Sequence, residues 1–296
     1  MRTEFSTRVS TRGTRLALAS ALSLFLAGSA AAQTPAPTPA ADPDPNTGAL
    51  TFTGGLDVPT KYMFRGLNQE PGDSKLTLFP YGDLGIAFYS GEGAIKSASV
   101  NFGVWNALLT GTSGLDGPQD KLHYEEDFYA TLNLGFARGF SLGTTYTAYT
   151  SPNGMFGTVQ ELMFKVSKSH MLAPYGIIAF ELDGQADGGE HEGVYLELGV
   201  APSWPLAGGK VTFAVPVKVG FSLSDYYERG DGTDSAFGYF QAGGLFTIPL
   251  SAATSKFGAW NLHGGVDVYA LGDTPKAFNN GDSGKVVASF GIGVVY

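Results

Sequence analysis

The feature that most constrains this chain is a two-residue alternation of side chains that recurs from residue 50 to residue 296. It is clearest in 285–296, where Val286, Phe290 and Ile292 fall on one side of an extended strand and Lys285 and Ser289 fall on the other. Side chains alternate across a β-strand, so the pattern predicts strands with one apolar face and one small or polar face. The segment 210–223 shows the same alternation.

Clusters of Gly, Asp, Asn and Pro divide the chain into further alternating runs. The predicted strands are 50–66, 76–89, 96–108, 123–137, 140–150, 159–167, 174–183, 191–202, 210–223, 235–250, 258–271 and 283–296. Twelve is an even number, as expected for a barrel in which both chain ends lie on one side.

An all-β chain of this kind can form a secreted β-sandwich or a transmembrane antiparallel up-and-down β-barrel. Most of the runs exceed the five or six residues usual in globular strands, and tilted membrane spans need about 9–11. The connections also alternate: the odd ones (67–75, 109–122, 151–158, 184–190, 224–234, 272–282) are mostly longer than the even ones (90–95, 138–139, 168–173, 203–209, 251–257). Long external loops and short periplasmic turns alternate this way in outer-membrane barrels, so the barrel is favoured.

The N-terminal segment predicts export. Residues 1–32 combine a basic start (Arg2, Arg8) with an apolar run from Leu16 to Leu26 and small residues before Gln33, which is the pattern of a cleaved signal peptide. A retained membrane anchor is the alternative, but a spanning helix needs about 20 apolar residues. We expect a Pro/Ala-rich periplasmic spacer at 33–49 and the barrel at 50–296.

Composition agrees with an envelope barrel. The chain has no Cys, only 15% charged residues, 42 Gly and 13% aromatic residues. Outside the signal no run approaches 18 apolar residues, so no inner-membrane helix is expected. The net charge of −9 excludes nucleic acid as a partner. We therefore predict the outer membrane of a Gram-negative bacterium, with its lipid and lipopolysaccharide (LPS) as surroundings.

If the apolar faces meet lipid, the charged side chains face inward, since charges in a membrane span must face protein or water. The predicted pore-lining residues are Asp57, Lys61, Arg65, Asp83, Glu125, Asp127, Glu161, Lys165, Glu197, Lys218 and Asp267, joined on the same parity by Glu181, Asp183, His263 and Lys285. Nine acids against five bases predict a preference for cations if the pore is open. The alternative is that these charges pair across the barrel and fill it.

Aromatic residues share the inward parity. The predicted lumen aromatics are Tyr81, Trp105, Tyr129, Tyr149, Tyr195, Tyr239 and Tyr269, together with Phe79 and Tyr89. Such rings could form a stacking track for a small solute such as a sugar. Alternatively they pack structurally, or belong to the aromatic girdles at the membrane interfaces. In either case bulky rings are expected to narrow the lumen.

One motif stands out at the end of the first predicted strand, Lys61-Tyr-Met-Phe-Arg-Gly-Leu-Asn-Gln69. It resembles the Tyr-x-Phe-Arg-Gly-x-Ser-Gln signature of the TorF-type porin family, although Asn68 stands where Ser is usual. Gly103-Val-Trp105, Glu125-Glu-Asp127 and Tyr146-Thr-Ala-Tyr149 follow in the order of that family. The resemblance implies a porin-like barrel without a known substrate. Strand parity places Arg65 inward, with an acid such as Asp83 as a possible partner, and Tyr62 and Phe64 outward.

Catalysis has little support in the sequence. Nucleophilic catalysis needs a His within reach of a Ser or Thr, and His263 and Asp267, four residues apart on one strand, are separated by about 14 Å. Gly-x-Ser-x-Gly and His-Glu-x-x-His are absent, and 231–234 lacks the full spacing of a calcium loop. We predict no enzyme activity, no metal and no cofactor, with a barrel lipase as the less favoured alternative.

The predicted function is passive diffusion of small hydrophilic solutes through the barrel. The alternative is a closed structural barrel whose external loops bind a partner. Phe290 and Tyr296 in the last strand resemble the C-terminal signal read by the barrel-assembly machinery. We also expect this strand to pair with the first one and so close the barrel.

Overall fold

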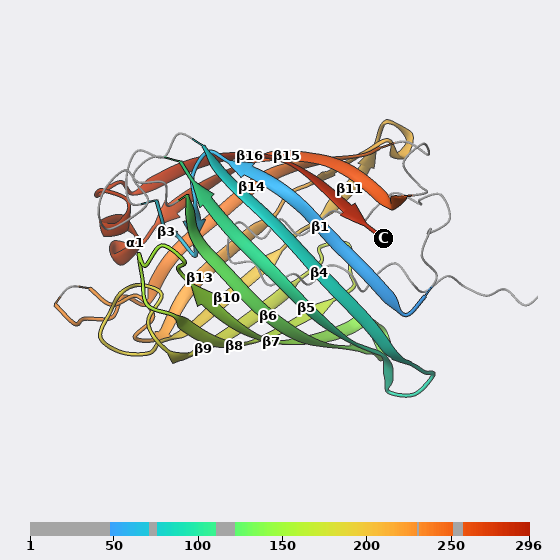
Figure 1. The fold of residues 1–296 in the computed structure, drawn as a ribbon, viewed down its shortest axis with the longest axis horizontal. Helices are drawn as coiled ribbons and strands as arrows, with labels where there is room; N and C mark the ends of the chain where they lie inside the picture. The colour runs from blue at the N-terminus through green and yellow to red at the C-terminus, as the bar shows by residue number, and fades with distance from the viewer. Residues whose placement is uncertain (1–47, 71–75, 111–121, 230, 251–256) are drawn as a thin grey trace, which may run out of the picture.

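Residues 48–70, 76–110, 122–229, 231–250 and 257–296 are described by a computed structural model (Figure 1). Alternating side chains produce long antiparallel strands that run obliquely around a common axis. The strands are β1 (Leu50–Pro59), β2 (Met63–Phe64), β3 (Leu67–Asn68), β4 (Thr77–Ser90), β5 (Ile95–Leu109), β6 (His123–Phe136), β7 (Phe140–Thr150), β8 (Val159–Lys168), β9 (Tyr175–Asp183), β10 (Val194–Val200), β11 (Ser203–Leu206), β12 (Val211–Ala214), β13 (Val217–Ser224), β14 (Phe237–Pro249), β15 (Ala259–Leu271) and β16 (Gly284–Val295).

The described strands form a closed antiparallel barrel of twelve spans. Fourteen strands belong to its sheet, but β10 with β11, and β12 with β13, are halves of single spans, so fourteen minus two gives twelve. Around the ring the order is β1, β4, β5, β6, β7, β8, β9, β10, β13, β14, β15 and β16. The predicted fold class and the predicted number of spans are therefore confirmed.

The barrel closes where expected, between the first and last spanning strands. β1 pairs antiparallel with β16 from Thr53↔Val295 to Pro59↔Ser289. The ladder continues to the last residue, because the Phe52 and Tyr296 main chains exchange two hydrogen bonds of 2.7 and 2.8 Å. No strand edge of the ring is left open at this seam, which satisfies the backbone groups that lipid cannot.

Two predicted strands are interrupted by proline. The segment predicted at 210–223 breaks at Val215 and Pro216, and the one predicted at 191–202 breaks at Ala201 and Pro202 before continuing as β11. Proline lacks the N–H that the ladder needs, so both spans kink at the same level. The paired halves β11 and β12 extend as a hairpin beyond the kinks.

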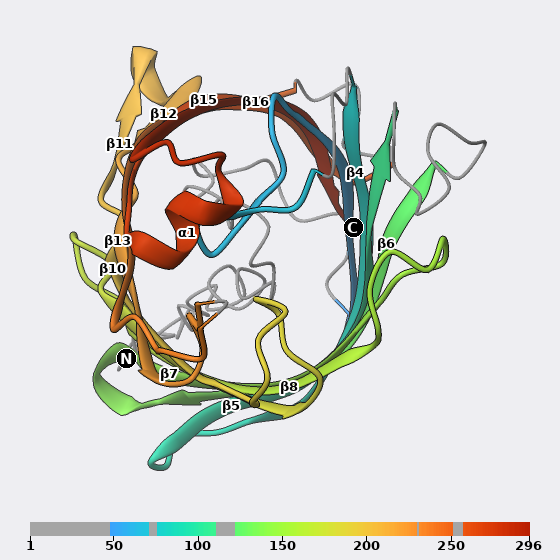
Figure 2. The same cartoon turned by 90° about the vertical axis from the view of Figure 1, so that its left-hand side faces the viewer.

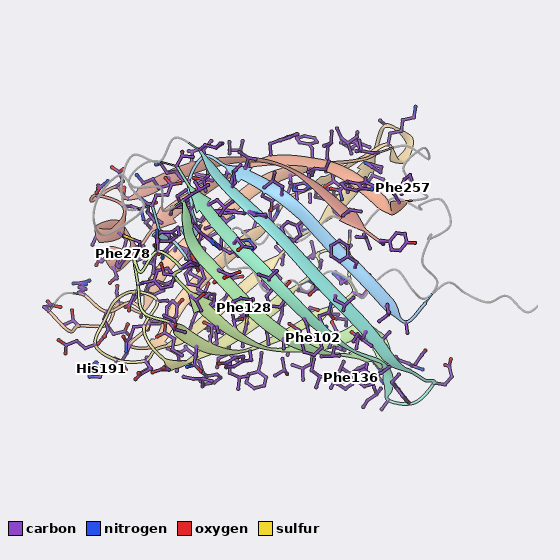
Figure 3. The ribbon with its side chains drawn as sticks, in the orientation of Figure 1. Phe102, Phe128, Phe136, His191, Phe257 and Phe278 are labelled. Carbon is purple, nitrogen blue, oxygen red and sulfur yellow. The ribbon has the colours of Figure 1, made fainter. Side chains whose placement is uncertain are left out.

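The outer wall of the barrel is apolar. Phe102 on β5 and Phe128 on β6, both labelled in Figure 3, lie on the outside of the barrel. Each is 51% exposed. The same face carries other large exposed apolar side chains, among them Leu84, Leu132, Val166, Leu198, Phe240, Phe246, Val266, Val268 and Phe290. An apolar belt of this extent needs an apolar medium around it, so the molecule has the character of a membrane barrel.

Most of the longer connections lie at one end of the barrel and most of the shorter ones at the other, as predicted. The long-loop end carries 60–76, 110–122, 151–158, 184–193, 225–236 and 272–283. The last of these contains a short helix, α1 (Asp273–Phe278), which lies over the barrel mouth in Figure 2. The predicted signal peptide (1–32) and all but the last two residues of the predicted spacer (33–49) lie outside the described residues.

Within the described ranges no helix is long and apolar enough to cross a membrane.

Candidate functional site

A hairpin enters the lumen where the first strand was expected to continue. The strand predicted at 50–66 ends at Pro59, and the chain turns inward to form the two-residue strands β2 and β3. Figure 2 shows this segment inside the ring of strands, beside α1. We call residues 61–70 the lumen hairpin. Tyr62 and Phe64, predicted to face lipid, are 1% and 5% exposed inside the barrel instead.

The tip of the lumen hairpin has an unusual backbone. Arg65 and Gly66 both have positive φ angles, 47° and 84°. A two-residue hairpin turn with positive φ at both positions is normally Asn-Gly or Asp-Gly. A Cβ on Gly66 would also press against the Tyr239 ring at 3.1 Å, so only glycine fits there. Arginine in the left-handed region costs about 1 kcal/mol or more, so its side chain must compensate for that cost.

Arg65 reaches the opposite wall of the barrel. β8, which carries Glu161, lies five strands away from β1 in the ring of twelve. The Arg65 guanidinium donates two hydrogen bonds to the Glu161 carboxylate, Nη1 to Oε2 at 2.6 Å and Nη2 to Oε1 at 2.8 Å. Nη1 also donates to the Tyr226 hydroxyl at 2.7 Å. The guanidinium carbon lies 4.2 Å from the Tyr195 ring centroid, a cation–π contact.

The lumen hairpin is packed on both sides. Tyr62 and Phe64 join a buried cluster with Phe79, Trp105, Ala107, Leu109, Tyr124, Tyr149 and Val159 on the β4–β8 side. Met63 and Leu67 join a second cluster with Ala179, Tyr195, Tyr226, Tyr227, Tyr239, Tyr269, Leu271 and Val287 on the β9–β16 side. Alternate side chains of the hairpin therefore pack against opposite walls of the barrel. At this level the lumen is filled mainly with aromatic rings.

Side chains from two external loops hold the main chain of the hairpin. The Tyr227 hydroxyl donates to the Arg65 carbonyl at 2.9 Å, and the Asn279 amide donates to the Gly66 carbonyl at 2.9 Å. At the base of the hairpin Glu70 pairs with Lys61 at 2.7 Å and accepts a hydrogen bond from the Tyr62 N–H. Sequence analysis missed Tyr227, Asn279 and Glu70, because loop residues carry no parity signal.

Glu125 and Asp127 face the hairpin from β6. The Tyr62 hydroxyl donates to Glu125 Oε2 at 2.7 Å, and both carboxylates are buried. On β7 the Tyr149 hydroxyl donates to Glu161 Oε1 at 3.2 Å. Acids thus line the wall at the level of the hairpin, and the hairpin supplies Tyr62 to Glu125 and Arg65 to Glu161.

Nearer the short-turn end the polar contacts run along the wall. The Asn101 amide donates to Asp83 at 2.5 Å, and the Asn133 amide donates to Asn101 at 3.0 Å. Hydroxyl pairs follow on the next strands, Thr131 with Thr145 and Ser141 with Ser167. We call this set, which runs from β4 to β8, the wall ladder. Each of its contacts joins neighbouring strands, so none of them spans the lumen.

The Asp57–His263 contact extends this wall network across the barrel seam. His263 Nε2 lies 2.6 Å from Asp57 Oδ1, and its Nδ1 lies 2.9 Å from Asn261 Oδ1. The contact passes over β16 at Gly291, where a Cβ would overlap both side chains. The predicted neighbour of His263, Asp267, is buried on the same strand but is not its partner.

Four inward tyrosines lie against the wall, of which Tyr175 was not among the predicted lumen aromatics. Tyr81, Tyr129, Tyr175 and Tyr239 each lie over the glycine directly opposite on the next strand, where a Cβ would overlap the ring; the pairs are Tyr81 with Gly55, Tyr129 with Gly103, Tyr175 with Gly199 and Tyr239 with Gly220. The glycine removes the side chain that would push the ring inward. Tyr81 and Tyr129 therefore lie along the wall, whereas Tyr239 also packs against the lumen hairpin.

Glu197 collects the predicted charges of the β8–β14 wall. Its carboxylate accepts hydrogen bonds from the hydroxyls of Tyr175, Tyr195 and Tyr239 at 2.8, 2.7 and 2.6 Å. Lys218 lies 3.6 Å away, and the Lys165 ammonium lies 4.7 Å from the Tyr175 ring centroid. These charges pair within one wall, whereas Arg65 pairs across the lumen with Glu161.

Other inward assignments fail for identifiable reasons. Tyr89 is 46% exposed, because the β4–β5 register shifts between Ala87 and Tyr89. Asp183 is exposed after a shift in β8–β9. Lys285 keeps the predicted parity, opposite the buried Tyr269, and pairs with Asp282 in the adjoining loop. Arg65 pairs with Glu161, not with Asp83. Each bulge reverses the parity beyond it, which a period-2 argument cannot foresee.

The histidines do not form a described catalytic arrangement. His123 Nε2 lies 2.8 Å from Asn106 Oδ1, and His263 contacts Asp57 and Asn261. In the described part of the chain neither histidine has a Ser or Thr hydroxyl among its hydrogen-bond partners, and no group of three or more His, Asp or Glu residues is arranged to hold a metal.

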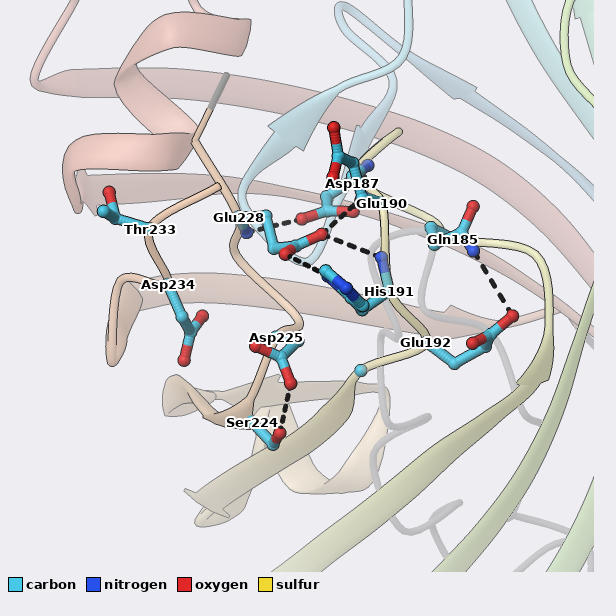
Figure 4. Close-up of polar contacts among 12 residues, drawn as sticks. Gln185, Asp187, Glu190, His191, Glu192, Ser224, Asp225, Glu228, Thr233 and Asp234 are labelled. Carbon is cyan, nitrogen blue, oxygen red and sulfur yellow. Dashed lines mark hydrogen bonds and ion pairs between the residues drawn. The ribbon is translucent and has the colours of Figure 1, made fainter. Parts of the chain in front are cut away.

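Carboxylates fasten two external loops together, as Figure 4 shows. Glu228 accepts hydrogen bonds from the Glu190 and His191 N–H groups at 2.5 and 3.0 Å, and from His191 Nδ1 at 2.9 Å. Asp187 Oδ2 accepts from the Glu228 N–H at 2.6 Å. The hydrogen bond to Glu228 raises the pKa of His191, and the same contact lowers the pKa of Glu228. We call this contact the loop clasp.

Comparisons with known proteins identify no family. No protein-family model matches the chain, and no curated protein matches it. The resemblance to the TorF-type porins therefore stays a prediction. Solved structures with similar folds include outer membrane phospholipase A from Escherichia coli (10% identity, 83% of this chain and 89% of that one, TM-score 0.43) and the NanC porin (12%, 83% and 98%, 0.38). A refined porin structure aligns at 9% identity over 83% and 99% of the two chains, with a TM-score of 0.32. These similarities are weak, and the fold assignment rests on strand order and register.

Proposed function

We propose that the protein is an outer-membrane channel of the porin type for small hydrophilic solutes, and that the lumen hairpin restricts the channel at its long-loop end. The observation that carries this proposal is the contrast between the two faces of the wall. Large apolar side chains cover the outside, whereas the inside carries hydrogen-bonded polar side chains that run along the wall. A polar lining around an enclosed passage is what aqueous solutes need.

The inner wall supports a preference for cations. Eight carboxylates of the spanning strands face inward, against three lysines; the acids are Asp57, Asp83, Glu125, Asp127, Glu161, Glu181, Glu197 and Asp267, and the lysines are Lys165, Lys218 and Lys285. Lys61 and Asp183, which entered the sequence-based count, do not belong to this wall. We propose that the acid excess selects cations once the hairpin no longer fills the lumen.

Conductance in planar bilayers tests the channel. The comparison is between the full chain and a variant in which residues 61–70 are replaced by a short Gly/Ser linker. We expect low conductance from the full chain and resolved, cation-preferring steps from the variant. Heat-modifiable migration on a gel establishes that both are folded. A folded variant without conductance above background would overturn the channel, and a clear anion preference would overturn the selectivity.

A closed structural barrel is the second candidate, and the loop contacts favour it. Tyr226, Tyr227 and Asn279 bind the lumen hairpin, and the loop clasp joins the neighbouring loop. Such loops present a fixed external surface that could bind a partner. If the linker variant is silent in bilayers, this candidate is supported in place of the channel.

We also propose that the last strand serves assembly in the outer membrane. Phe290 and Tyr296 point outward from β16 and are 57% and 46% exposed. Lipid, LPS and the barrel-assembly machinery are the partners that this outward face would meet. Replacement of both aromatics by Ala should lower the folded yield in cells while leaving the conductance of the protein that does fold unchanged.

A further inference from the structure

The position of Arg65 defines a binding site that belongs to the barrel wall. Without the arginine, the site consists of the Glu161 carboxylate on β8, the Tyr149 hydroxyl on β7, the Tyr195 ring on β10 and the Tyr226 hydroxyl from the 225–236 loop. Glu161 is 2% exposed and Tyr195 and Tyr226 are each 1% exposed, so these groups are shielded from solvent. We call them the cation cage.

The chemistry of the cage specifies its occupant. A carboxylate that accepts two parallel N–H bonds matches a planar guanidinium, and an aromatic face 4.2 Å from the guanidinium carbon favours any organic cation. The Tyr226 hydroxyl accepts a third hydrogen bond at 2.7 Å. Glu181 lies opposite Glu161 on β9, but among the described residues no group of three or more His, Asp or Glu side chains is arranged to hold a metal ion.

Arg65 adopts a backbone conformation that arginine disfavours, which indicates that its side chain, and not its backbone preference, accounts for arginine at this position. Arg65 has a φ of 47° where Asn, Asp or Gly is preferred. The guanidinium is carried into the cage on a covalent tether, which gives it an effective concentration of roughly millimolar. A free cation of the same chemistry must therefore compete at comparable concentration.

We propose that Arg65 occupies a site for small organic cations, and that a solute bearing a guanidinium or ammonium group binds the cation cage by displacing it. Displacement moves the hairpin tip away from β8, and with it the rings that fill the lumen. The wall then presents Glu125, Asp127, Glu161 and Glu181 without a balancing base. The consequence for transport rests on the proposed channel, whereas binding to the cage does not.

Binding is tested on the refolded full chain in detergent, with N-ethylguanidinium as the probe and the neutral N-ethylurea as its counterpart. In Arg65→Ala we expect saturable calorimetric binding of ethylguanidinium, at least tenfold weaker binding in Arg65→Ala/Glu161→Gln, and none for ethylurea. Arg229→Ala is the matched control, because Arg229 pairs with Asp273 in an exposed loop. The site is overturned if Arg65→Ala does not bind ethylguanidinium, or if Arg65→Ala/Glu161→Gln binds it equally well.

Displacement is tested in the chain that keeps Arg65, so it does not depend on whether Arg65→Ala folds. Tyr62 of the hairpin lies 5.4 Å from the Trp105 ring, so movement of the hairpin should change Trp105 emission in a Trp204→Phe/Trp260→Phe background. We expect a saturable change with ethylguanidinium at roughly millimolar concentration and none with ethylurea. No change with ethylguanidinium overturns displacement. A change without any rise in conductance supports the site and overturns the channel.

Discussion

The level of the lumen hairpin and the level of the wall ladder solve the problem of inward polar groups in different ways. At the hairpin, contacts cross the lumen: Arg65 binds Glu161 on the far wall and Tyr226 in a distant loop. In the ladder, Asp83, Asn101 and Asn133 bind the neighbouring strand. Contacts that cross the lumen obstruct it, whereas contacts along the wall leave its centre free. The difference explains how one barrel can have contacts across its lumen at one level and a polar lining along its wall at another.

We call the Arg65–Glu161 contact the brace. The largest effect on stability is expected when this contact is broken at Glu161. Glu161→Gln leaves the buried Arg65 guanidinium without its carboxylate, which should cost about 3–5 kcal/mol. The measurement is the denaturant midpoint of the barrel refolded in lipid vesicles. Asp273→Asn is the control, because it breaks the exposed Arg229–Asp273 pair, which should be worth about 0–1 kcal/mol. Equal shifts in the two variants would mean that the brace carries no special stability.

Local patterns explain why the wall was predictable and the brace was not. Period-2 alternation is a property of each strand alone, so it placed Glu161, Glu197 and Tyr239 inward before any pairing was known. The entry of the hairpin depends on Arg65-Gly66, a turn that lies outside the usual Asn-Gly and Asp-Gly signals. The Arg65–Glu161 pair joins residues 96 apart in sequence, and only the stagger of the closed ring brings them together.

The motif at 61–69 falls on the lumen hairpin, but strand parity predicted the wrong orientation for Tyr62 and Phe64. Tyr62 and Phe64 keep the alternation of a strand, and nothing local distinguishes packing against lipid from packing against Phe79 and Tyr149 inside the barrel. Pro59 was the available signal, since proline is confined to strand ends, edges and bulges. The tyrosine–glycine pairs likewise needed the strand register, because Tyr129 and Gly103 lie on different strands.

The wall itself should respond strongly to loss of its glycines. In Gly103→Ala the new Cβ overlaps the Tyr129 ring, so the ring must swing inward or the strands must separate. Such overpacking should cost about 1–3 kcal/mol, measured by the same unfolding midpoint. Gly82→Ala on β4 is the control, because its nearest neighbour is Phe52 at 3.7 Å. Equal costs at both glycines would remove the argument that tyrosines lie against the wall.

A smaller effect is expected in the wall ladder. Thr131→Val removes the 2.9 Å hydroxyl contact with Thr145, both of which are 1% exposed, at about 1 kcal/mol. Because this contact lies along the wall, the conductance of the Gly/Ser-linker variant should not change. A change in single-channel conductance would show that the ladder protrudes into the passage, and would contradict the statement that contacts along the wall leave the centre of the lumen free.

The smallest effect concerns the loop clasp between Glu228 and His191, which lies in the external loops. His191 has a raised pKa, so its contribution is fully present below the unfolded value of about 6.5 and is lost as pH rises through the raised one. Glu228 has a lowered pKa, so its contribution is present above about 4.3 and is lost as pH falls through the lowered one. The clasp is therefore tightest between these limits.

Spin labels can follow the clasp because the chain has no cysteine. Labels at Glu190→Cys and Asp231→Cys, both on exposed loop positions, should show the narrowest distance distribution at mildly acidic pH and broader ones on either side. His191→Gln should abolish the broadening above pH 6.5 while leaving the acidic limb, since Glu228 still accepts from the Glu190 and His191 N–H groups. If broadening on the alkaline side persists, the clasp opens for another reason. In that case the external loops move independently of the contacts that Tyr226 and Tyr227 make with Arg65 of the lumen hairpin.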